Sequence, residues 1–595
     1  MKILIFLLFF LNTKKSFQVM LDKDSLIYLS PKIEEILKVE GTFIYDFTVS
    51  KKGIFLSTGD KIYHNDKVIY EEKENNLFAL TINKENLYFG VSPESVVYEW
   101  KDNKIIRKYK IPASNILRMV PSEKNILLGT SYPALIYQIG KEEKILQKIP
   151  DENISTLTLK KETLYIGTSP KGYLYQLAIN NPKDLKLLLD CEEEEIKDIA
   201  IKDNLIYFIT NSDKKMPSLY SFDKIKKEIK EIFSFSCSTL FSLTIKGETL
   251  FVCGSDNILY RIIPEKNYYL IYGFNCEALT KIFLYENEIY LASGYPPKIY
   301  KLKKELAKEG SYLSPIIDLK FISKFGKMEI ESYLPLLSSY EIWTRSGSNN
   351  IIDESWSEFE RLKDNKIKSP ENRYFQYLIK LKREKGEESP IIKKVRYFYK
   401  NINQPPKIKT IKISSDSENP RIKIIRYEAF DPNNDSLIHN LYYQIKDDEN
   451  WFLLVKDIKE NEYKLDGRIL PDGFYKIKLI TSDEVTQIKS EALKDSIISD
   501  EFLIDNTPPQ LISFDKEKKG EKYHFKIKIA DSLSTIKGFY YSIDNEKEEK
   551  LLSADGIFDD KEEEFILEIK KESFLLNIRF FDEYLNEKRL NWLIK

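Results

Sequence analysis

A repeat of about 40 residues in the first half of this 595-residue chain constrains the fold more than any other feature. Each copy contains a strand, a turn with small residues and a second strand with a tyrosine, as in LYIGTSPKGYLYQL from Leu164. Four short apolar runs occur in each copy, and none has the 3.6-residue periodicity of a helix. This pattern is typical of a four-stranded propeller blade. Seven copies occur, and their aligned tyrosines are Tyr63, Tyr98, Tyr137, Tyr175, Tyr220, Tyr260 and Tyr300.

A closed ring is the expected arrangement of these copies. One four-stranded sheet cannot bury both of its apolar faces, whereas copies stacked radially cover one another and a closed ring leaves few exposed edges. We therefore expect a seven-bladed β-propeller over residues 19–305. Tyr28 precedes Tyr63 by 35 residues, the spacing of a further copy, although no complete repeat comes before it. Residues from about 19 to 40 are therefore predicted to supply outer strand material to the last blade and to join the two ends of the ring.

The repeat region resembles the bacterial propellers that are related to the Trp-Asp and YVTN repeat families. The resemblance lies in the architecture and in the phrase LYIGTSPKGYLYQL, because the Gly-His and Trp-Asp dipeptides of the first family and the lettered motif of the second are absent. Such propellers serve in binding, catalysis and scaffolding alike. The resemblance therefore implies a fold and does not select a function.

The second half of the chain has longer alternating strands and two proline-containing breaks, at residues 403–406 and 505–509. Consecutive prolines block helices and strand ladders, so both breaks are interpreted as linkers. Residues 311–401 resemble a galactose-binding-like jelly roll, and residues 407–504 resemble a fibronectin type III or related immunoglobulin-like module. A further immunoglobulin-like sandwich is expected over residues 509–595. The predicted fold class is thus all-β, a seven-bladed β-propeller followed by three β-sandwich domains.

Strict alternation predicts which side chains of two strands face the core. In RYFQYLIKL, from Arg373, the inward residues are Phe375, Tyr377, Ile379 and Leu381. In KYHFKIKI, from Lys522, they are Tyr523, Phe525, Ile527 and Ile529, and His524 is expected outside.

Two tryptophans and two arginines in the jelly-roll region have alternative interpretations. Trp343 and Trp356 are expected in the core, with a sugar-stacking platform as the alternative. Arg345 and Arg373 are interpreted as strand-face residues, with binding of a carboxylate or sulfate as the alternative.

The amino terminus is predicted to be a signal peptide or leader over residues 1–18. It has one lysine followed by nine apolar residues from Ile3, which suits a secretory leader and is shorter than the roughly 20 residues of a membrane-spanning helix. No small-x-small cleavage triplet follows, so a buried N-terminal strand is the alternative. We expect export to the periplasm, cell surface or medium, with no transmembrane segment elsewhere.

The four cysteines, Cys191, Cys237, Cys253 and Cys276, lack metal-ligand spacing. They are interpreted either as buried free thiols or as neighbours within disulfide range.

Charge and motif content exclude several functions. Lys plus Arg is 92 and Asp plus Glu is 93, so a nucleic-acid binder that acts through bulk charge is not expected. The three histidines are far apart in the sequence, which argues against a multi-histidine metal site. No nucleophile elbow, zinc-protease or phosphate-loop motif is present.

One polar turn suggests a cation site. Asp431, Asn433 and Asp435 place oxygen side chains at alternate positions and begin like a calcium loop. Ser436 replaces the required glycine and Tyr442 replaces the bidentate glutamate. A hydrogen-bonded Asx turn is therefore the favoured interpretation, and these three residues are a candidate calcium site as the alternative.

The expected function is that of a noncatalytic, exported scaffold or binding protein that presents a propeller face to a protein or glycan partner. The alternative is a carbohydrate-active hydrolase or lyase whose carboxylates converge at the propeller axis. A sensing ectodomain is a third possibility. No cofactor is expected, with calcium as the one alternative, and no catalytic residue is assigned.

Overall fold

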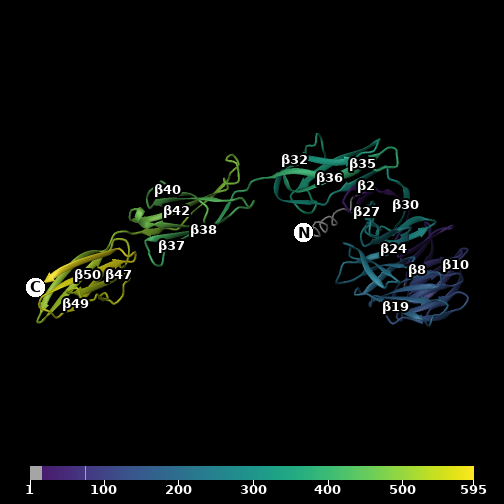
Figure 1. The fold of residues 1–595 in the computed structure, drawn as a ribbon, viewed down its shortest axis with the longest axis horizontal. Coiled ribbons are helices and arrows are strands. Elements are labelled where there is room, and N and C mark those ends of the chain that lie inside the picture. The colour runs from purple at the N-terminus through teal and green to yellow at the C-terminus, as the bar shows by residue number, and fades with distance from the viewer. Residues whose placement is uncertain (1–15, 74) are drawn as a thin grey trace. The chain divides into compact units, whose positions relative to one another are not determined.

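The computed structural model describes residues 16–73 and 75–595 (Figure 1). The described residues form two compact units, which divide after residue 401. In the described residues the regular elements are antiparallel β-strands and one 3-10 turn, Gly467–Ile469. The prediction of an all-β chain is therefore confirmed.

Seven four-stranded antiparallel units occupy the N-terminal part of the described chain, and we call them blades one to seven. Blades one to three consist of β4 (Asp46–Ser50), β5 (Gly53–Ser57), β6 (Lys61–His64) and β7 (Lys67–Glu71); β8 (Asn76–Asn83), β9 (Asn86–Ser92), β10 (Val96–Lys101) and β11 (Lys104–Lys110); and β12 (Asn115–Pro121), β13 (Ile126–Ser131), β14 (Leu135–Ile139) and β15 (Lys144–Lys148). Blades four and five consist of β16 (Asn153–Lys160), β17 (Thr163–Ser169), β18 (Tyr173–Ala178) and β19 (Leu185–Asp190); and β20 (Glu195–Lys202), β21 (Leu205–Asn211), β22 (Ser218–Asp223) and β23 (Glu228–Ser234). Blades six and seven consist of β24 (Leu240–Lys246), β25 (Thr249–Gly254), β26 (Leu259–Ile263) and β27 (Asn267–Tyr272); and β28 (Leu279–Tyr285), β29 (Glu288–Ser293), β30 (Lys298–Leu306) and β3 (Pro31–Lys38).

The blades form a closed ring. The first strand of each blade contacts the first strand of the next, and β28 of blade seven contacts β4 of blade one. The fourth strand of blade seven is β3, which comes from the N-terminus and pairs with β30 in the register Glu34↔Lys301. Such a ring of radial four-stranded sheets is a β-propeller. The predicted propeller is thus confirmed for the N-terminal half, and a strand from within residues 19–40 closes it.

The small residue of the repeated phrase lies where adjacent blades approach most closely. A Cβ atom added to Gly167 would lie 2.7 Å from Ile196 Cγ2 of blade five. Gly129 meets Ile154 of blade four at the same 2.7 Å. Real Cβ atoms do not approach other carbons this closely, so the packing of blade on blade accounts for glycine at these positions.

The tyrosine of each copy lies on the third strand of its blade. Tyr260 is 1 % exposed, and its hydroxyl donates to Asp256 Oδ2 at 2.6 Å. Tyr300 is 2 % exposed and donates to the backbone oxygen of Asn275 at 3.2 Å. A tyrosine suits this position because its ring fills the space between sheets while its hydroxyl reaches a polar group at the edge.

An N-terminal hairpin joins the propeller to the following region. Strand β1 (Val19–Asp22) pairs with β27 of blade six, and β2 (Ile27–Leu29) pairs with β36. The following region contains β31 (Glu309–Leu313), β32 (Ile317–Tyr333), β33 (Ser338–Gly347), β34 (Glu360–Arg361), β35 (Asn372–Arg383) and β36 (Ile391–Asn401).

The region 311–401 shares a hydrophobic core with blade six. The start of the long strand β32 pairs with β35, and its later part pairs with β36. Phe375, Tyr377, Ile379 and Leu381 are all buried, as their alternation predicts. The same cluster includes Leu250 of blade six. The apolar core is therefore continuous across residues 305–311, where the sequence places a domain boundary.

The C-terminal unit contains two modules, each with two antiparallel sheets around its own apolar cluster. The first module has β37 (Lys407–Ser415), β38 (Ile422–Phe430) and β41 (Glu462–Asp466) in one sheet and β39 (Ile438–Ile445), β40 (Phe452–Ile458), β42 (Gly473–Ser482), β43 (Lys494–Ile498) and β44 (Phe502–Ile504) in the other. The last module has β45 (Gln510–Lys519), β46 (Lys522–Ala530) and β49 (Glu562–Ile569) in one sheet and β47 (Ile536–Ile543), β48 (Glu549–Lys550), β50 (Phe574–Asp582) and β51 (Glu587–Ile594) in the other. On β46 the four predicted core residues are buried and His524 is half-exposed, as predicted.

Candidate functional sites

The propeller axis contains a cavity of about 240 Å³, lined by residues of the first strands. Four charged side chains line it, Asp46, Arg118, Asp198 and Lys281. Lys281 of blade seven forms an ion pair with Asp46 of blade one, and burial lowers the pKa of Lys281 to about 8. Burial also lowers the pKa of Arg118 and raises that of Asp198. Two acids and two bases therefore balance one another inside the cavity.

The two axial carboxylates also tie neighbouring blades together. Asp46 Oδ2 accepts a hydrogen bond from the backbone amide of Leu80 in blade two at 3.0 Å. Asp198 Oδ2 accepts from the amide of Leu243 in blade six at 2.8 Å and from Ser242 Oγ at 3.1 Å. Carboxylates that accept several such bonds stabilise the ring.

An aromatic cluster stands at one end of this cavity. The rings of Phe43 and Tyr45 are 5.1 Å apart, Tyr45 lies 5.4 Å from Phe78, and Phe43 lies 6.1 Å from Phe241. Tyr45 and Phe241 line the cavity, and Tyr45 is 43 % exposed. We call these four residues the axial aromatic cluster.

Two further exposed tyrosines occur at the same end of the ring. The start of each first strand pairs with the end of its second strand, as in Asn115↔Ser131. The loops between second and third strands therefore lie at the end where first strands begin. Tyr132 and Tyr295 occupy two of these loops and are 57 % and 60 % exposed. We call this end of the ring the aromatic face.

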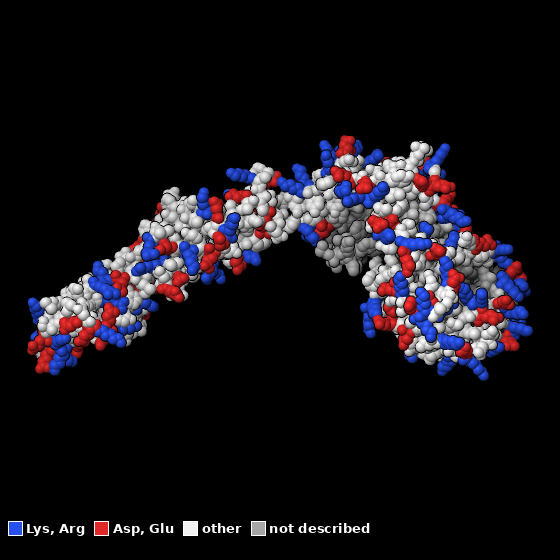
Figure 2. All heavy atoms as spheres, viewed as in Figure 1, with Lys and Arg blue, Asp and Glu red and all other residues white. Residues whose placement is uncertain are grey.

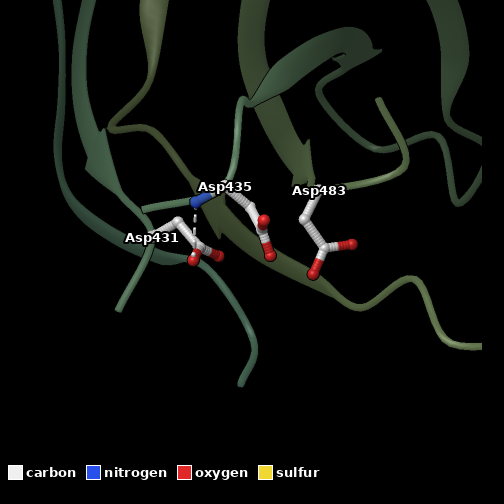
Figure 3. A group of neighbouring side chains, drawn as sticks. All are labelled: Asp431, Asp435 and Asp483. Atoms are coloured by element: carbon white, nitrogen blue, oxygen red, sulfur yellow. Dashed lines mark hydrogen bonds between the residues drawn. The ribbon is translucent and has the colours of Figure 1, made fainter. Parts of the chain in front are cut away.

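A second candidate site is a group of carboxylates in the C-terminal unit, the Asp431 cluster. Asp431 follows β38, Asp435 lies in the same loop, and Asp483 follows β42. Each residue offers a carboxylate oxygen, and these oxygens lie within 4.8 Å of one another. Figure 3 shows the three side chains pointing toward one another. Two of the three sequence candidates thus come together with an acid that the sequence did not indicate.

The third sequence candidate is directed elsewhere. Asn433 Oδ1 accepts a hydrogen bond from the backbone amide of Gln404 at 2.8 Å, so this side chain binds the linker that precedes the module. Asn403 of that linker reaches the Asp431 cluster instead, because its Nδ2 donates to Asp483 Oδ2 at 2.7 Å. The structure thus groups Asp483 with Asp431 and Asp435, whereas the side chain of Asn433 binds the linker. Asp431 also forms the predicted Asx turn, since its Oδ1 accepts from the amides of Asn433 and Asp435.

The last module carries an equivalent group, Asp505, Asp531 and Asp582, whose carboxylate oxygens also lie within 4.8 Å of one another. Asp505 lies in the second linker, Asp531 follows β46, and Asp582 ends β50, so their places in the module match those of Asn403, Asp431 and Asp483. All three are buried. Burial raises the pKa of Asp582 to about 7, and burial also raises the pKa of Asp505.

This buried group predicts a pH dependence of stability. The folded state keeps a proton on Asp582 up to about pH 7, whereas the unfolded chain loses it near pH 4, so folding becomes less favourable as the pH rises through this window. We expect the free energy of unfolding of the last module to fall by roughly 2–4 kcal/mol between about pH 4.5 and about pH 8.

The pH dependence of this free energy is measured by unfolding the full chain in urea at several pH values, with hydrogen exchange of β46 and β50 as the probe of the last module. Asp555→Asn is a control that should keep the same fall in stability between about pH 4.5 and about pH 8. The carboxylate of Asp555 is exposed, and hydrogen bonds from Ser553 and Ile557 lower its pKa. Lys423 also faces the group. Burial lowers the pKa of Lys423 to about 8, at the upper end of this pH range, so Asp582 dominates the change below it. Stability that stays constant or rises over this pH range contradicts the prediction.

Trp356 and both arginines of the region 311–401 have hydrogen-bond partners within the fold, whereas the buried Nε1 of Trp343 has none. Trp356 is 8 % exposed, and its Nε1 donates to backbone oxygens of Asn349 and Ile351. Arg345 donates to Gln376 Oε1 at 2.6 Å, and Arg373 forms a two-pronged pair with Asp318. Trp343 is half-buried beneath Lys380. These contacts favour structural roles over a sugar platform or an anion clamp.

The described cysteines and histidines also have local explanations. All four cysteines are free, and burial raises the pKa of Cys191, Cys237 and Cys276 to about 12, so these thiols stay protonated at neutral pH. His439 is buried, and its Nδ1 lies 2.9 Å from Thr481 Oγ1. His524 lies 3.1 Å from Glu568.

The surface carries mixed charge. Figure 2 shows lysine and arginine interspersed with aspartate and glutamate over the visible face. In the part of the chain that the structure describes, no helix has the length and apolarity needed to cross a membrane. The predicted leader falls mostly within residues 1–15, which lie outside the described residues.

Comparisons with known proteins give similarity in fold. No family model matches the chain, and no curated protein matches it. Similar solved structures include the WD40 propeller domain of Doa1, with 12% identity, TM-score 0.38 and coverage of 46% of this chain and 98% of that one. BamB from Moraxella catarrhalis has 12% identity and TM-score 0.34, covering 49% of this chain and 92% of that one. The extracellular domain of BT4673 from B. thetaiotaomicron has 12% identity and TM-score 0.39, covering 95% of this chain and 98% of that one. The propeller assignment here follows from the strand pairing described above.

Proposed function

We propose that this chain is a noncatalytic, exported binding protein whose propeller presents the aromatic face to a protein or glycan partner. The exposed aromatic residues around the axial cavity carry the proposal. Tyrosine and phenylalanine offer large rigid surfaces that stack on sugars or pack into protein pockets at little entropic cost. Soluble proteins seldom leave such groups clustered unless something covers them.

The remaining modules fit a supporting role in this proposal. We propose that residues 311–401, 407–504 and 509–595 are galactose-binding-like, fibronectin type III-like and immunoglobulin-like β-sandwiches that act as spacers and mount the propeller on the cell surface or in an envelope complex. The last two modules each have an apolar cluster of their own, which supports a role as spacers. Export is supported by the apolar sequence from Ile3.

A carbohydrate-active hydrolase is the second candidate. Asp46 and Asp198 line the same cavity, and a raised pKa of the kind found for Asp198 is what a general acid requires. The ion pair of Asp46 and the inter-blade hydrogen bonds of Asp198 favour the binding role, because a general acid or nucleophile needs a carboxylate that is free to reach substrate.

Substitution of the aromatic face tests the proposed function. We expect Tyr45→Ala combined with Phe241→Ala to weaken retention of envelope proteins or binding to a glycan array at least tenfold, because two stacking surfaces are removed. Ile225→Ala is the control, since this 72 % exposed side chain lies in a loop between third and fourth strands, at the opposite end of the ring.

The same glycan panel separates the two candidates. Turnover that is lost in Asp198→Asn, together with no partner recovered by the unaltered chain, would establish the enzyme. Binding that survives the double substitution refutes the role of the aromatic face.

A further inference from the structure

Two buried oxygens at the Asp431 cluster have no hydrogen-bond partner. Asp431 is 6 % exposed, and its Oδ2 accepts no hydrogen bond. Figure 3 shows the carboxylate of Asp431 directed toward Asp435. The second oxygen is Oδ1 of Asn403, whose amide group contacts Asp483. Buried polar atoms without partners are costly in a folded protein, so two such oxygens beside one group of carboxylates favour a bound ion or water at this place.

The negative charge of the three carboxylates also favours a bound cation at the cluster. Three carboxylates this close repel one another strongly in a partly buried setting. The described hydrogen bonds offset part of this repulsion, with Asp483 Oδ1 accepting from the amide of Leu493 at 2.7 Å and Asp435 Oδ2 accepting from Gln487 Nε2 at 2.7 Å. In the described part of the chain, no lysine or arginine forms an ion pair with these three acids.

We propose that the cluster binds one Ca²⁺ ion through Asp431, Asp435 and Asp483, with the side-chain oxygen of Asn403 as a fourth ligand. Calcium–oxygen distances are about 2.3–2.6 Å, so oxygens on opposite sides of one ion are about 4.8 Å apart. The three carboxylate oxygens lie within 4.8 Å of one another, so they are close enough to bind one ion together. Calcium takes six to eight oxygens, so water or second carboxylate oxygens complete the shell. An all-oxygen, carboxylate-rich site suits calcium and does not suit zinc or copper.

Calcium at this position fixes the linker that follows residue 401. Asn403 donates to the backbone oxygen of Glu491 at 2.9 Å as well as to Asp483. The amide of Gln404 donates to Asn433 in the loop that also contains Asp431 and Asp435. The ion therefore joins the linker, the 431–435 loop and the end of β42. We infer that Ca²⁺ orders residues 402–404 on the first module of the C-terminal unit.

The inference uses the proposed function only for location, because millimolar calcium is characteristic of the extracellular space. Binding of Ca²⁺ by the purified chain does not depend on any partner of the aromatic face. Failure of either proposal thus leaves the other unaffected.

Calorimetric titration of the EDTA-treated full chain with CaCl₂ tests the site. We expect saturable binding with a dissociation constant on the order of 0.1–1 mM, the range of extracellular calcium modules. Asp483→Asn and Asp435→Asn are each expected to weaken this site at least tenfold. Glu484→Gln is the matched control, because it removes the same charge at the neighbouring position, where Glu484 pairs with Lys494 on the surface.

Two further measurements keep the result unambiguous. Asp435→Asn is the second variant in case Asp483→Asn fails to fold. Asp435 is only half-buried, and its carboxylate accepts a hydrogen bond from Gln487. Hydrogen exchange of the peptide around residues 400–408 is expected to slow in Ca²⁺ in the wild-type chain and not in Asp435→Asn. MgCl₂ is expected to bind at least tenfold more weakly, because Mg²⁺ demands a smaller octahedral shell.

The proposal is overturned if Ca²⁺ does not bind saturably up to about 10 mM, or if both aspartate variants bind it as the wild type does. Binding that leaves the exchange of the linker peptide unchanged overturns the role assigned to the linker. Equal affinity for Mg²⁺ overturns the assignment to calcium.

Discussion

A chain that begins at Gly41 is expected to lose the folded propeller. This truncation removes β3, which supplies the fourth strand of blade seven, and leaves the edge of β30 unpaired. It also removes Ile33, which is 7 % exposed and packs among residues of blades six and seven. The loss of a strand ladder and its apolar contacts is expected to cost more than about 5 kcal/mol, as much as the whole stability of many domains.

Thermal unfolding followed by circular dichroism, with light scattering for aggregation, measures this effect. A chain that begins at Ser16 is the control, because it keeps every described strand. We expect the control to unfold cooperatively and the Gly41 chain to aggregate through its open edge. If the Gly41 chain retains the melting temperature of the control, the assignment of β3 as the closing strand is wrong.

Gly167→Val is expected to destabilise the ring by about 3 kcal/mol or more. Even the first carbon of the new side chain would lie 2.7 Å from Ile196 Cγ2 of the next blade and 2.7 Å from Thr156 Cγ2 of its own. These neighbours are held by strands on both sides, so the steric clash with the valine side chain can be removed only if blades four and five move apart. Such a movement also weakens the hydrogen bond from Ser155 Oγ to the backbone oxygen of Ile196.

Urea unfolding of the two variant chains measures the free-energy change. Thr163→Val places the same side chain on the same strand, β17, at a half-buried position, and is expected to change stability by less than about 0.5 kcal/mol. Equal effects of the two substitutions contradict the close approach of blades at Gly167.

The repeat made most of the N-terminal half predictable, for physical reasons that particular residues illustrate. The tyrosine of each third strand packs its ring between sheets, and the hydroxyls of Tyr260 and Tyr300 reach a polar group, which accounts for tyrosine at these positions. Glycine recurs at Gly129 and Gly167 because the next blade lies against it. Alternation on β46 likewise predicted its core side, because a period of two places alternate side chains on opposite faces of a sheet.

The candidate sites were less predictable because their residues are distant in sequence. The loop containing Asp431 and Asp435 stood out as a local motif, whereas Asn403 and Asp483 join it only after β37 and β42 have packed together. Asn433 fits the same local motif, yet its oxygen binds the linker. The axial ion pair of Lys281 and Asp46 joins the last blade to the first. A local sequence pattern cannot predict a contact between residues so far apart in the chain.

Disulfide trapping between β3 and β30 tests the closed ring most directly. Glu34 and Lys301 are directly opposed in the register, and opposed residues of antiparallel strands have Cα atoms about 4.5–5.5 Å apart, within disulfide range. In Glu34→Cys combined with Lys301→Cys, we predict that mild oxidation links residues 34 and 301 within one chain and raises the thermal midpoint, and that peptide mapping identifies the link. A link that forms only between chains, or none under conditions where the protein is folded, would show that the N-terminal strand does not close the propeller.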